Sequence, residues 1–235
     1  MKVNHAVKCT VSLIVAMFVL NDCLAATPEP AHCANNLASP IANFCEVQPK
    51  VLWRGAKPDQ NASAWLIQNG VKTIINLELL YDDIDTLHEA NVNHAGLYQL
   101  DYFRVKTWEP LYAFAHDAAD DDVIHFLAIA KQAKQPIYVH CRAGENRTGV
   151  MIAAYKIILQ NQEVTAVVNE MQSYKGFWSE ATTKYIKDLA LRRTEILSKV
   201  NVYKVETPTH IICDNGNCES KRSILPTGNS NNNAQ

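Results

Sequence analysis

The sequence predicts an α/β fold, with a central, mainly parallel sheet flanked by helices in a three-layer sandwich. Short β-branched, apolar runs alternate with segments whose apolar residues recur at helical spacing. The 235 residues, 48% of them hydrophobic and 20% charged, fit one domain with short extensions. The formal net charge of −2 provides no basic field over the whole molecule, so nucleic acid is not an expected partner.

The first 26 residues have the layout of a secretory signal peptide. Two lysines precede the apolar run at 11–20, which is short for a membrane span, and Ala25-Ala26 ends the segment with small residues. A buried N-terminal helix and a lipid anchor at Cys23 are the alternatives. We expect the signal to be removed and the mature protein to have no stable membrane insertion.

The remaining chain divides by composition and periodicity. An irregular leader is expected at 27–49, a folded domain at 50–200, a hairpin-like extension at 201–219 and a polar, disordered tail at 220–235. Within the domain, strands are expected at 51–54, 71–77, 96–102 and 137–140, and helices at 58–70, 82–90, 120–130, 149–159, 165–173 and 180–198.

The cysteines favour an oxidising compartment. Cys33, Cys45, Cys141, Cys213 and Cys218 remain after the signal, and four of them can pair if Cys141 is a reactive thiol. Four cysteines allow three connectivities. We favour the local pairs Cys33 with Cys45 and Cys213 with Cys218. A zinc site is the alternative, but these cysteines lack the C-x-x-C spacing.

The most informative segment follows the expected strand at 137–140. It reads His140-Cys141, then five residues, then Arg147-Thr148 at the start of an apolar helix. Backbone N–H groups of the loop can converge on an anion there, helped by the positive end of the helix. The loop residues are Arg142, Ala143, Gly144, Glu145, Asn146 and Arg147. Gly144 permits the unusual backbone angles of such a cradle, and the Arg147 guanidinium can bind two phosphate oxygens.

Cys141 at the base of this cradle predicts nucleophilic chemistry. The positive surroundings that hold phosphate also stabilise a thiolate, which can attack phosphorus to form a cysteinyl-phosphate that water hydrolyses. Thr148 is expected to donate a hydrogen bond to the sulfur, and His140 to fix the loop through its ring nitrogens. This chemistry requires no cofactor and no metal. An inert core cysteine is the alternative.

The same residues resemble the signature of the protein tyrosine phosphatase superfamily, in its dual-specificity-like branch. Residues 52–58 (LWRGAKP) resemble the "YRGAQP" segment of bacterial members, and residues 71–77 resemble their "GIKTVINL" strand. The resemblance spans residues 51–191 and implies a cysteine-dependent phosphatase with the superfamily's α/β fold. Some members are exported bacterial proteins, which agrees with the predicted signal peptide.

The resemblance also implies a general acid, which in the family is an Asp on a mobile loop before the nucleophile strand. The corresponding segment, 103–122, contains several carboxylates, and Asp117 resembles the acid of an exported bacterial relative. Asp101 and Glu109 are alternatives. Asp120, with its two acidic neighbours, has a structural alternative as a helix N-cap and first-turn acid.

The loop charges bear on the substrate. Arg142 is opposed by Glu145, and a carboxylate near the pocket disfavours a polyanion. A phosphorylated protein or small phosphate ester is therefore expected, with phosphotyrosine first and phosphoserine or phosphothreonine as further substrates. The alternatives are an inositol polyphosphate or phosphoinositide, or a module that binds phosphorylated ligands without catalysis.

Two glycosylation sequons indicate where the protein is made. One begins at Asn61 and the other at Asn146, inside the phosphate loop, where a glycan would block the site. We therefore expect a bacterial protein that is exported to the periplasm or secreted.

Overall fold

The computed structural model describes residues 37–90, 97–215 and 217–222 of the chain. The predicted signal peptide, Cys33 and the tail from residue 223 lie outside the described residues.

Within the described residues, seven strands form one mixed sheet in the order β1-β2-β5-β3-β4-β6-β7. The strands are β1 (Cys45–Gln48), β2 (Leu52–Ala56), β3 (Thr73–Asn76), β4 (Leu97–Arg104), β5 (Ile137–Cys141), β6 (Thr209–Asp214) and β7 (Asn217–Arg222). The central strands β2, β5, β3 and β4 run parallel to one another. β1 joins one edge and the β6–β7 hairpin the other, all antiparallel.

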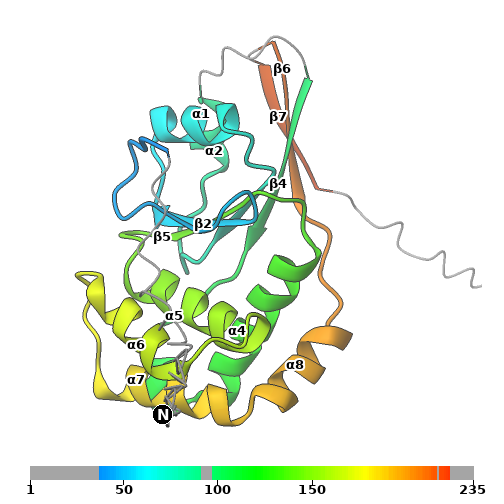
Figure 1. The fold of residues 1–235 in the computed structure, drawn as a ribbon. Coiled ribbons are helices and arrows are strands. Elements are labelled where there is room, and N and C mark those ends of the chain that lie inside the picture. The colour runs from blue at the N-terminus through cyan, green and yellow to red at the C-terminus, as the bar shows by residue number, and fades with distance from the viewer. Residues whose placement is uncertain (1–36, 91–96, 216, 223–235) are drawn as a thin grey trace, which may run out of the picture.

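Helices cover both faces of the sheet, as Figure 1 shows. The helices α1 (Gln60–Gln68) and α2 (Ile84–His88) lie on one face. The other face carries α4 (His116–Gln132), α5 (Asn146–Ala154), α6 (Val164–Ser173), α7 (Glu180–Leu191) and α8 (Arg193–Val202), with the short α3 (Leu111–Phe114) beside them. The predicted three-layer α/β arrangement is confirmed.

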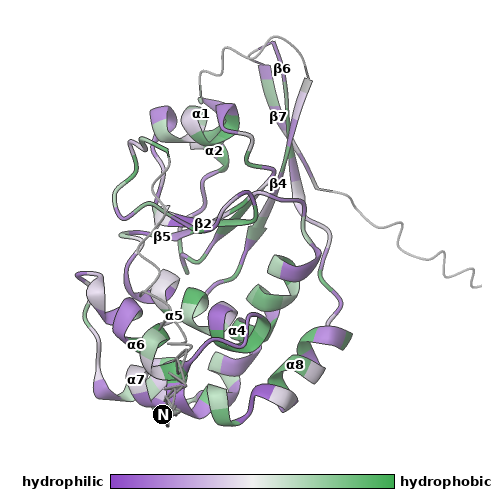
Figure 2. Cartoon of the chain, in the orientation of Figure 1, coloured by the Kyte–Doolittle hydropathy of each residue, from purple (hydrophilic) through white to green (hydrophobic). Residues whose placement is uncertain are grey.

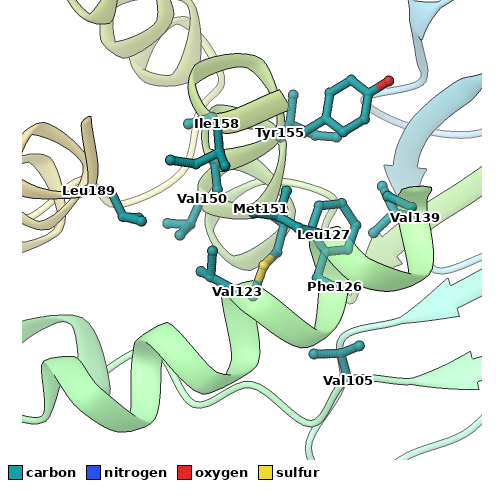
Figure 3. Close-up of a cluster of buried hydrophobic side chains, with 14 of the residues drawn as sticks. Val105, Val123, Phe126, Leu127, Val139, Val150, Met151, Tyr155, Ile158 and Leu189 are labelled. Atoms are coloured by element: carbon teal, nitrogen blue, oxygen red, sulfur yellow. The ribbon is translucent and has the colours of Figure 1, made fainter. Parts of the chain in front are cut away.

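The central strands are apolar on both faces because both are covered. Along β3, Ile74 packs in the core under α1 and α2, and Ile75 in the larger core on the opposite face. Along β5, Tyr138 packs in the core under α1 and α2, and Val139 packs in the larger core, as the two-residue period of a strand requires. Figure 2 shows the apolar residues of α4 and α5 gathered toward the sheet, and Figure 3 shows Phe126, Val139 and Met151 in the larger core.

Three boundaries differ from the predictions. The leader expected to be irregular at 27–49 contains β1, which has too few residues to show a pattern but pairs with β2. The single helix expected at 180–198 is two helices that meet at Arg192. Residues 220–222, which were expected to belong to the polar tail, are part of β7 and pair with β6. Two of these boundaries depend on pairing with the neighbouring strand, which the propensity of the segment itself does not report.

The segment before the nucleophile strand also differs. α4 begins at His116 and not at Asp120, and the short helix α3 precedes it inside the expected loop. Asp117 therefore lies in the first turn of α4 instead of before the helix. Asp120 is not an N-cap, because it lies in the second turn and is buried.

The C-terminal hairpin carries a disulfide between Cys213 and Cys218, one of the two pairs that the sequence favoured. Cys45 is also disulfide-bonded, and Cys33, its predicted partner, lies outside the described residues. Cys141 is a free, buried thiol. Across residues 37–90, 97–215 and 217–222, every helix is too short or too polar to cross a membrane.

Candidate active site

Cys141 ends β5 at the carboxyl edge of the parallel strands, the edge where α/β proteins commonly bind ligands. The residue is 3% exposed and belongs to the larger hydrophobic core. Gly144 has φ +70°, and a Cβ there would lie 2.3 Å from the carbonyl carbon of Gly55. Only glycine fits, because the loop bends sharply and also approaches the β2 backbone closely. The loop leads directly into α5, whose first residue is Asn146.

Arg147 lies in the first turn of α5, with its guanidinium turned toward the segment after β4. Its Nη1 donates to the carbonyl of Leu77 at 3.3 Å, and its Nε lies 3.3 Å from Glu109 Oε1. An arginine held by one carboxylate can exchange that partner for a phosphate, because both anions can present two oxygens to the guanidinium. The structure therefore brings Glu109 to the predicted phosphate-binding arginine.

His140 is fully buried and connects the loop to a polar cluster behind it. Its Nε2 lies 2.9 Å from Asp83 Oδ2, and its Nδ1 lies 3.4 Å from the carbonyl oxygen of Cys141. Asp83 also lies 3.2 Å from Lys57 Nζ and accepts a hydrogen bond from Asn76 Nδ2 at 2.7 Å. Burial would raise the pKa of Asp83, but the charges of His140 and Lys57 outweigh it and hold the pKa below its ordinary value.

This cluster was not predicted from the sequence. Lys57 and Asp83 each carry a charge that could have suggested a polar site, but nothing in their local pattern links them to His140. The contacts form because β2, β3 and the residues before α2 meet at the carboxyl edge of the sheet.

Two buried hydroxyls near Cys141 have no hydrogen-bond partner among the described residues. Thr148 Oγ1, predicted to donate to the sulfur, is one, and Tyr112 Oη is the other. Burial, with smaller effects from nearby charges that include Cys141, raises the pKa of Tyr112 well above its ordinary value. Buried hydroxyls usually have a partner, so these two are available to a bound polar group.

The remaining loop side chains turn outward. Arg142 and Ala143 are exposed. Glu145 Oε1 accepts a hydrogen bond from Asn43 Nδ2 at 3.2 Å. The Asn146 side chain accepts a hydrogen bond from the N–H of Phe177 at 3.2 Å and donates one to the carbonyl of Phe177. Of the predicted phosphate-binding residues, Glu145 and Asn146 thus use their side chains to tie the loop to neighbouring segments.

The four carboxylates considered as general acid occupy different surroundings. Asp117 is exposed in the first turn of α4, and its side chain forms no ion pair or hydrogen bond among the described residues. Asp120 is bound by Arg192 and accepts from Tyr185 Oη at 2.9 Å. Asp101 pairs with Lys134 and His210 near the start of β3, at the opposite edge of the sheet from Cys141. Of these, Glu109 alone contacts a residue of the phosphate loop.

A cavity of about 220 Å³ adjoins the loop. Its walls include Glu109, Tyr112, Asn146, Val150 and Phe177. Among the described residues that line it, Glu109 is the one that carries a charge. Phe177 is 82% exposed at its rim. A mostly apolar cavity with an exposed aromatic rim suits the carbon skeleton of a phosphate ester better than a second anion.

Comparisons with known proteins agree with this geometry. Residues 38–188 match the family model described as a DSP-PTPase phosphatase fused to NAD+ kinase. The chain is 31% identical over 159 residues to the dual specificity protein phosphatase TpbA of Pseudomonas aeruginosa, which covers 66% of this chain and 64% of the relative. The chain thus spans just under two thirds of that relative's length.

Solved structures show the same fold. A crystal structure of P. aeruginosa TpbA superposes with a TM-score of 0.52 at 25% identity, covering 68% of this chain and 91% of that one. The core catalytic domain of the PP-IP phosphatase SIW14 of S. cerevisiae, solved with citrate, gives 0.53 at 22% identity, covering 69% and 94%. Because the family model matches well over half of the chain, from the segment before β1 into α7, this protein belongs to the family of DSP-PTPase phosphatase domains that are also found fused to NAD+ kinase.

Proposed function

We propose that this protein hydrolyses phosphate monoesters through a cysteinyl-phosphate intermediate, with phosphotyrosine in proteins as its preferred substrate. The observation that carries the proposal is the placement of Cys141. It is a buried, free thiol at the carboxyl edge of the sheet, followed by a glycine-dependent loop that leads into α5, whose first turn carries Arg147. This arrangement binds a tetrahedral oxyanion directly above a nucleophile.

The reaction follows in two steps. The Cys141 thiolate attacks phosphorus, the S–P bond forms and the ester P–O bond breaks, while a carboxylic acid gives its proton to the leaving oxygen. Water then attacks phosphorus while the carboxylate takes one of its protons, and the S–P bond breaks, releasing inorganic phosphate and the thiolate and restoring the carboxylic acid. Arg147 and the loop N–H groups hold the charge on the phosphoryl oxygens in both steps. Asp117 is the proposed acid by its resemblance, and Glu109 is the rival because it already contacts Arg147.

The surroundings of the loop favour an aromatic ester over a polyanion. Glu109 and Glu145 place negative charge on two sides of the loop. Two exposed aromatic side chains lie close by: Trp108 precedes Glu109 in the chain, and Phe177 lies at the rim of the cavity. Like charges would repel the additional phosphates of an inositol polyphosphate. Phosphoserine and phosphothreonine are proposed as further substrates, because they carry one phosphate of the same charge.

The test is hydrolysis of p-nitrophenyl phosphate by residues 27–235, beside Cys141→Ser, with EDTA present. We expect turnover that survives EDTA and disappears in the variant. A phosphotyrosine peptide should then have a higher kcat/KM than inositol hexakisphosphate. Absence of turnover by protein whose Cys141 is reduced, together with retained binding of the phosphopeptide, would instead identify a non-catalytic binding module.

Export is part of the proposal. The signal-like first 26 residues, the disulfide Cys213–Cys218 and the disulfide at Cys45 support a periplasmic or secreted bacterial protein. Expression of the full chain in a bacterial host, followed by cell fractionation and intact mass measurement, tests this. We expect a product outside the cytoplasm that has lost residues 1–26. A full-length product confined to the cytoplasm would reject export.

A further inference from the structure

The carbonyl groups of the phosphate loop are held by donors from β2 and the segment before β1. Lys57 N–H donates to the carbonyl of Arg142 at 3.2 Å. The side chain of Asn43 donates to the carbonyl of Ala143 at 2.9 Å. The guanidinium of Arg54 donates to the carbonyl of Gly144 at 2.5 Å. Three consecutive loop carbonyls are therefore fixed on the same side of the loop.

This arrangement decides which way the loop N–H groups point. A trans peptide is planar, so its N–H points opposite to its C=O. If the carbonyls of 142, 143 and 144 point toward β2 and the leader, the N–H groups of 143, 144 and 145 point to the other side. An anion is stabilised by converging N–H groups, and a carbonyl turned inward would repel it. Holding the carbonyls thus prepares the cradle before the substrate arrives.

Arg54 is unusual among the residues that hold the loop carbonyls because its charged side chain is buried. It is 1% exposed, and its guanidinium carbon lies 3.7 Å from the centre of the Tyr174 ring. Burial lowers the pKa of Arg54, and Tyr174 and Cys141 partly oppose that effect. A buried charge is costly unless it has a specific partner. The carbonyl of Gly144 is such a partner, and no apolar side chain could replace the donor.

Asn43 reaches the loop from outside the parallel sheet. It lies in the turn before β1, two residues before the disulfide-bonded Cys45, and has φ +55°. Asparagine tolerates this left-handed conformation better than most residues. Its Nδ2 contacts both the Ala143 carbonyl and Glu145 Oε1, so it also ties the Glu145 carboxylate to the leader.

We propose that Arg54 and Asn43 are positioning residues that orient the peptide groups of the phosphate loop, which makes the segment before β1 a working part of the anion site. The role in catalysis rests on the proposed phosphatase function. The effect on anion binding does not, and it can be measured without turnover.

The first experiment measures tungstate binding by calorimetry to residues 27–235 carrying Cys141→Ser, with Asn43→Gly added. Glycine keeps the left-handed backbone and removes both hydrogen bonds. Asn161→Gly is the matched control, because Asn161 has φ +56°, is exposed and makes no side-chain hydrogen bond among the described residues. We expect Asn43→Gly to weaken binding about 10-fold at an unchanged Tm relative to the control. Equal affinities for the two variants would overturn the proposal.

A second variant sharpens the result. Asn43→Asp keeps the shape and the backbone preference but replaces the donor by an acceptor that faces the Ala143 carbonyl and Glu145. We expect weaker tungstate binding than in Asn43→Gly, because the new charge repels both the loop carbonyl and the anion. Binding by Asn43→Asp as tight as that of the parent would contradict the role assigned to the donor.

Arg54→Lys tests the guanidinium, with Arg193→Lys as control. Arg193 Nε also donates to a backbone carbonyl, that of Ile157, but away from the loop. In enzyme with Cys141 intact, we expect Arg54→Lys to lower kcat/KM about 10²-fold, mainly through kcat, and Arg193→Lys to leave it within twofold. Folded Arg54→Lys with full activity would overturn the assignment, and if it does not fold, the Asn43 variants decide. Wild-type protein that binds tungstate through Asn43 yet hydrolyses nothing would reject the proposed function and keep this inference.

Discussion

The two flanks of the phosphate loop differ in how firmly the structure holds them. We call one side the held flank; it consists of Asn43, Arg54, Lys57 and Asp83. Its residues contact the loop and His140 through hydrogen bonds and ion pairs. Arg54 and Asp83 are each 1% exposed. The open flank, residues 108–117, contains Trp108 at 50% exposure and Phe114 at 67%. Among the described residues, the one ion pair between this flank and the loop joins Glu109 to Arg147.

The difference separates two tasks of the proposed reaction. The nucleophile and the anion cradle must be ready before the substrate binds, because electrostatic stabilisation is strongest when the dipoles need not reorganise. The acid acts on the leaving group, whose position depends on the substrate, so an exposed segment can serve it. We therefore expect changes on the held flank to alter anion binding, stability and kcat, and loss of the acid on the open flank to lower kcat without altering anion binding.

The largest effect is expected from the acid on the open flank. Asp117→Asn should lower kcat/KM for a phosphotyrosine peptide by about 10²-fold or more, because the phenoxide then leaves without a proton. The loss should be much smaller with p-nitrophenyl phosphate, whose leaving group needs no proton. The measurement is steady-state kinetics with both substrates, and tungstate binding in the Cys141→Ser background should stay unchanged.

Glu109→Gln provides the comparison. If Asp117 is the acid, this change should lower KM, because Arg147 no longer exchanges a carboxylate partner for phosphate. A substrate-dependent loss of kcat in Glu109→Gln, with normal kcat in Asp117→Asn, would transfer the acid role to Glu109. It would also show that the sequence resemblance misplaced this residue.

A smaller effect is expected from Asp83 on the held flank. Asp83→Asn leaves Lys57 and His140 facing a neutral amide, which should cost about 3 kcal/mol of unfolding free energy at pH 7. The pKa of Asp83 is lowered by folding, so its contribution is present above the ordinary value near 3.8 and is lost as the pH falls through the folded value. The difference between wild type and variant in urea denaturation should therefore shrink below pH 4. A constant difference from pH 7 to pH 3 would contradict this reading.

The smallest effect is expected from Asp122, which follows the open flank in α4. Burial, opposed by His125 and reinforced by Asp121, raises the pKa of Asp122 to about 6. A raised carboxyl pKa means that the charged form destabilises the fold above that pH and that the effect disappears near pH 3.5. Asp122→Asn should raise stability by about 1 kcal/mol at pH 8, after allowance for solvent screening, and leave kcat unchanged. Equal Tm values for wild type and Asp122→Asn at pH 8 would contradict the prediction that the Asp122 charge destabilises the fold.

The sequence indicated the class of fold and the nucleophile for local reasons. The β-branched run before Cys141, Gly144 and the apolar helix after Arg147 are contiguous, so the phosphate loop follows from one short segment. The disulfide between Cys213 and Cys218 likewise joins residues that a short turn separates. Where strands and helices alternate with clear periods, the three-layer arrangement follows as well.

The sequence was a weaker guide where distant contacts decide the outcome. Asp120 is engaged by Arg192, 72 residues later, and not by a helix N-terminus. The acid could not be chosen from several carboxylates in one segment, because local patterns do not report which side chain reaches the loop.

The amino-acid sequence by itself determined the α/β alternation, the position of Cys141 and Arg147, and the glycine that lets the loop close, since each depends on neighbouring residues. Only the tertiary structure decided that Asn43 and Arg54 hold the loop carbonyls and that Asp83 and Lys57 lie behind His140. These residues are brought to the loop by the order of strands in the sheet. A hydrogen bond between residues about a hundred positions apart leaves no periodicity in the chain, because its geometry arises from packing alone.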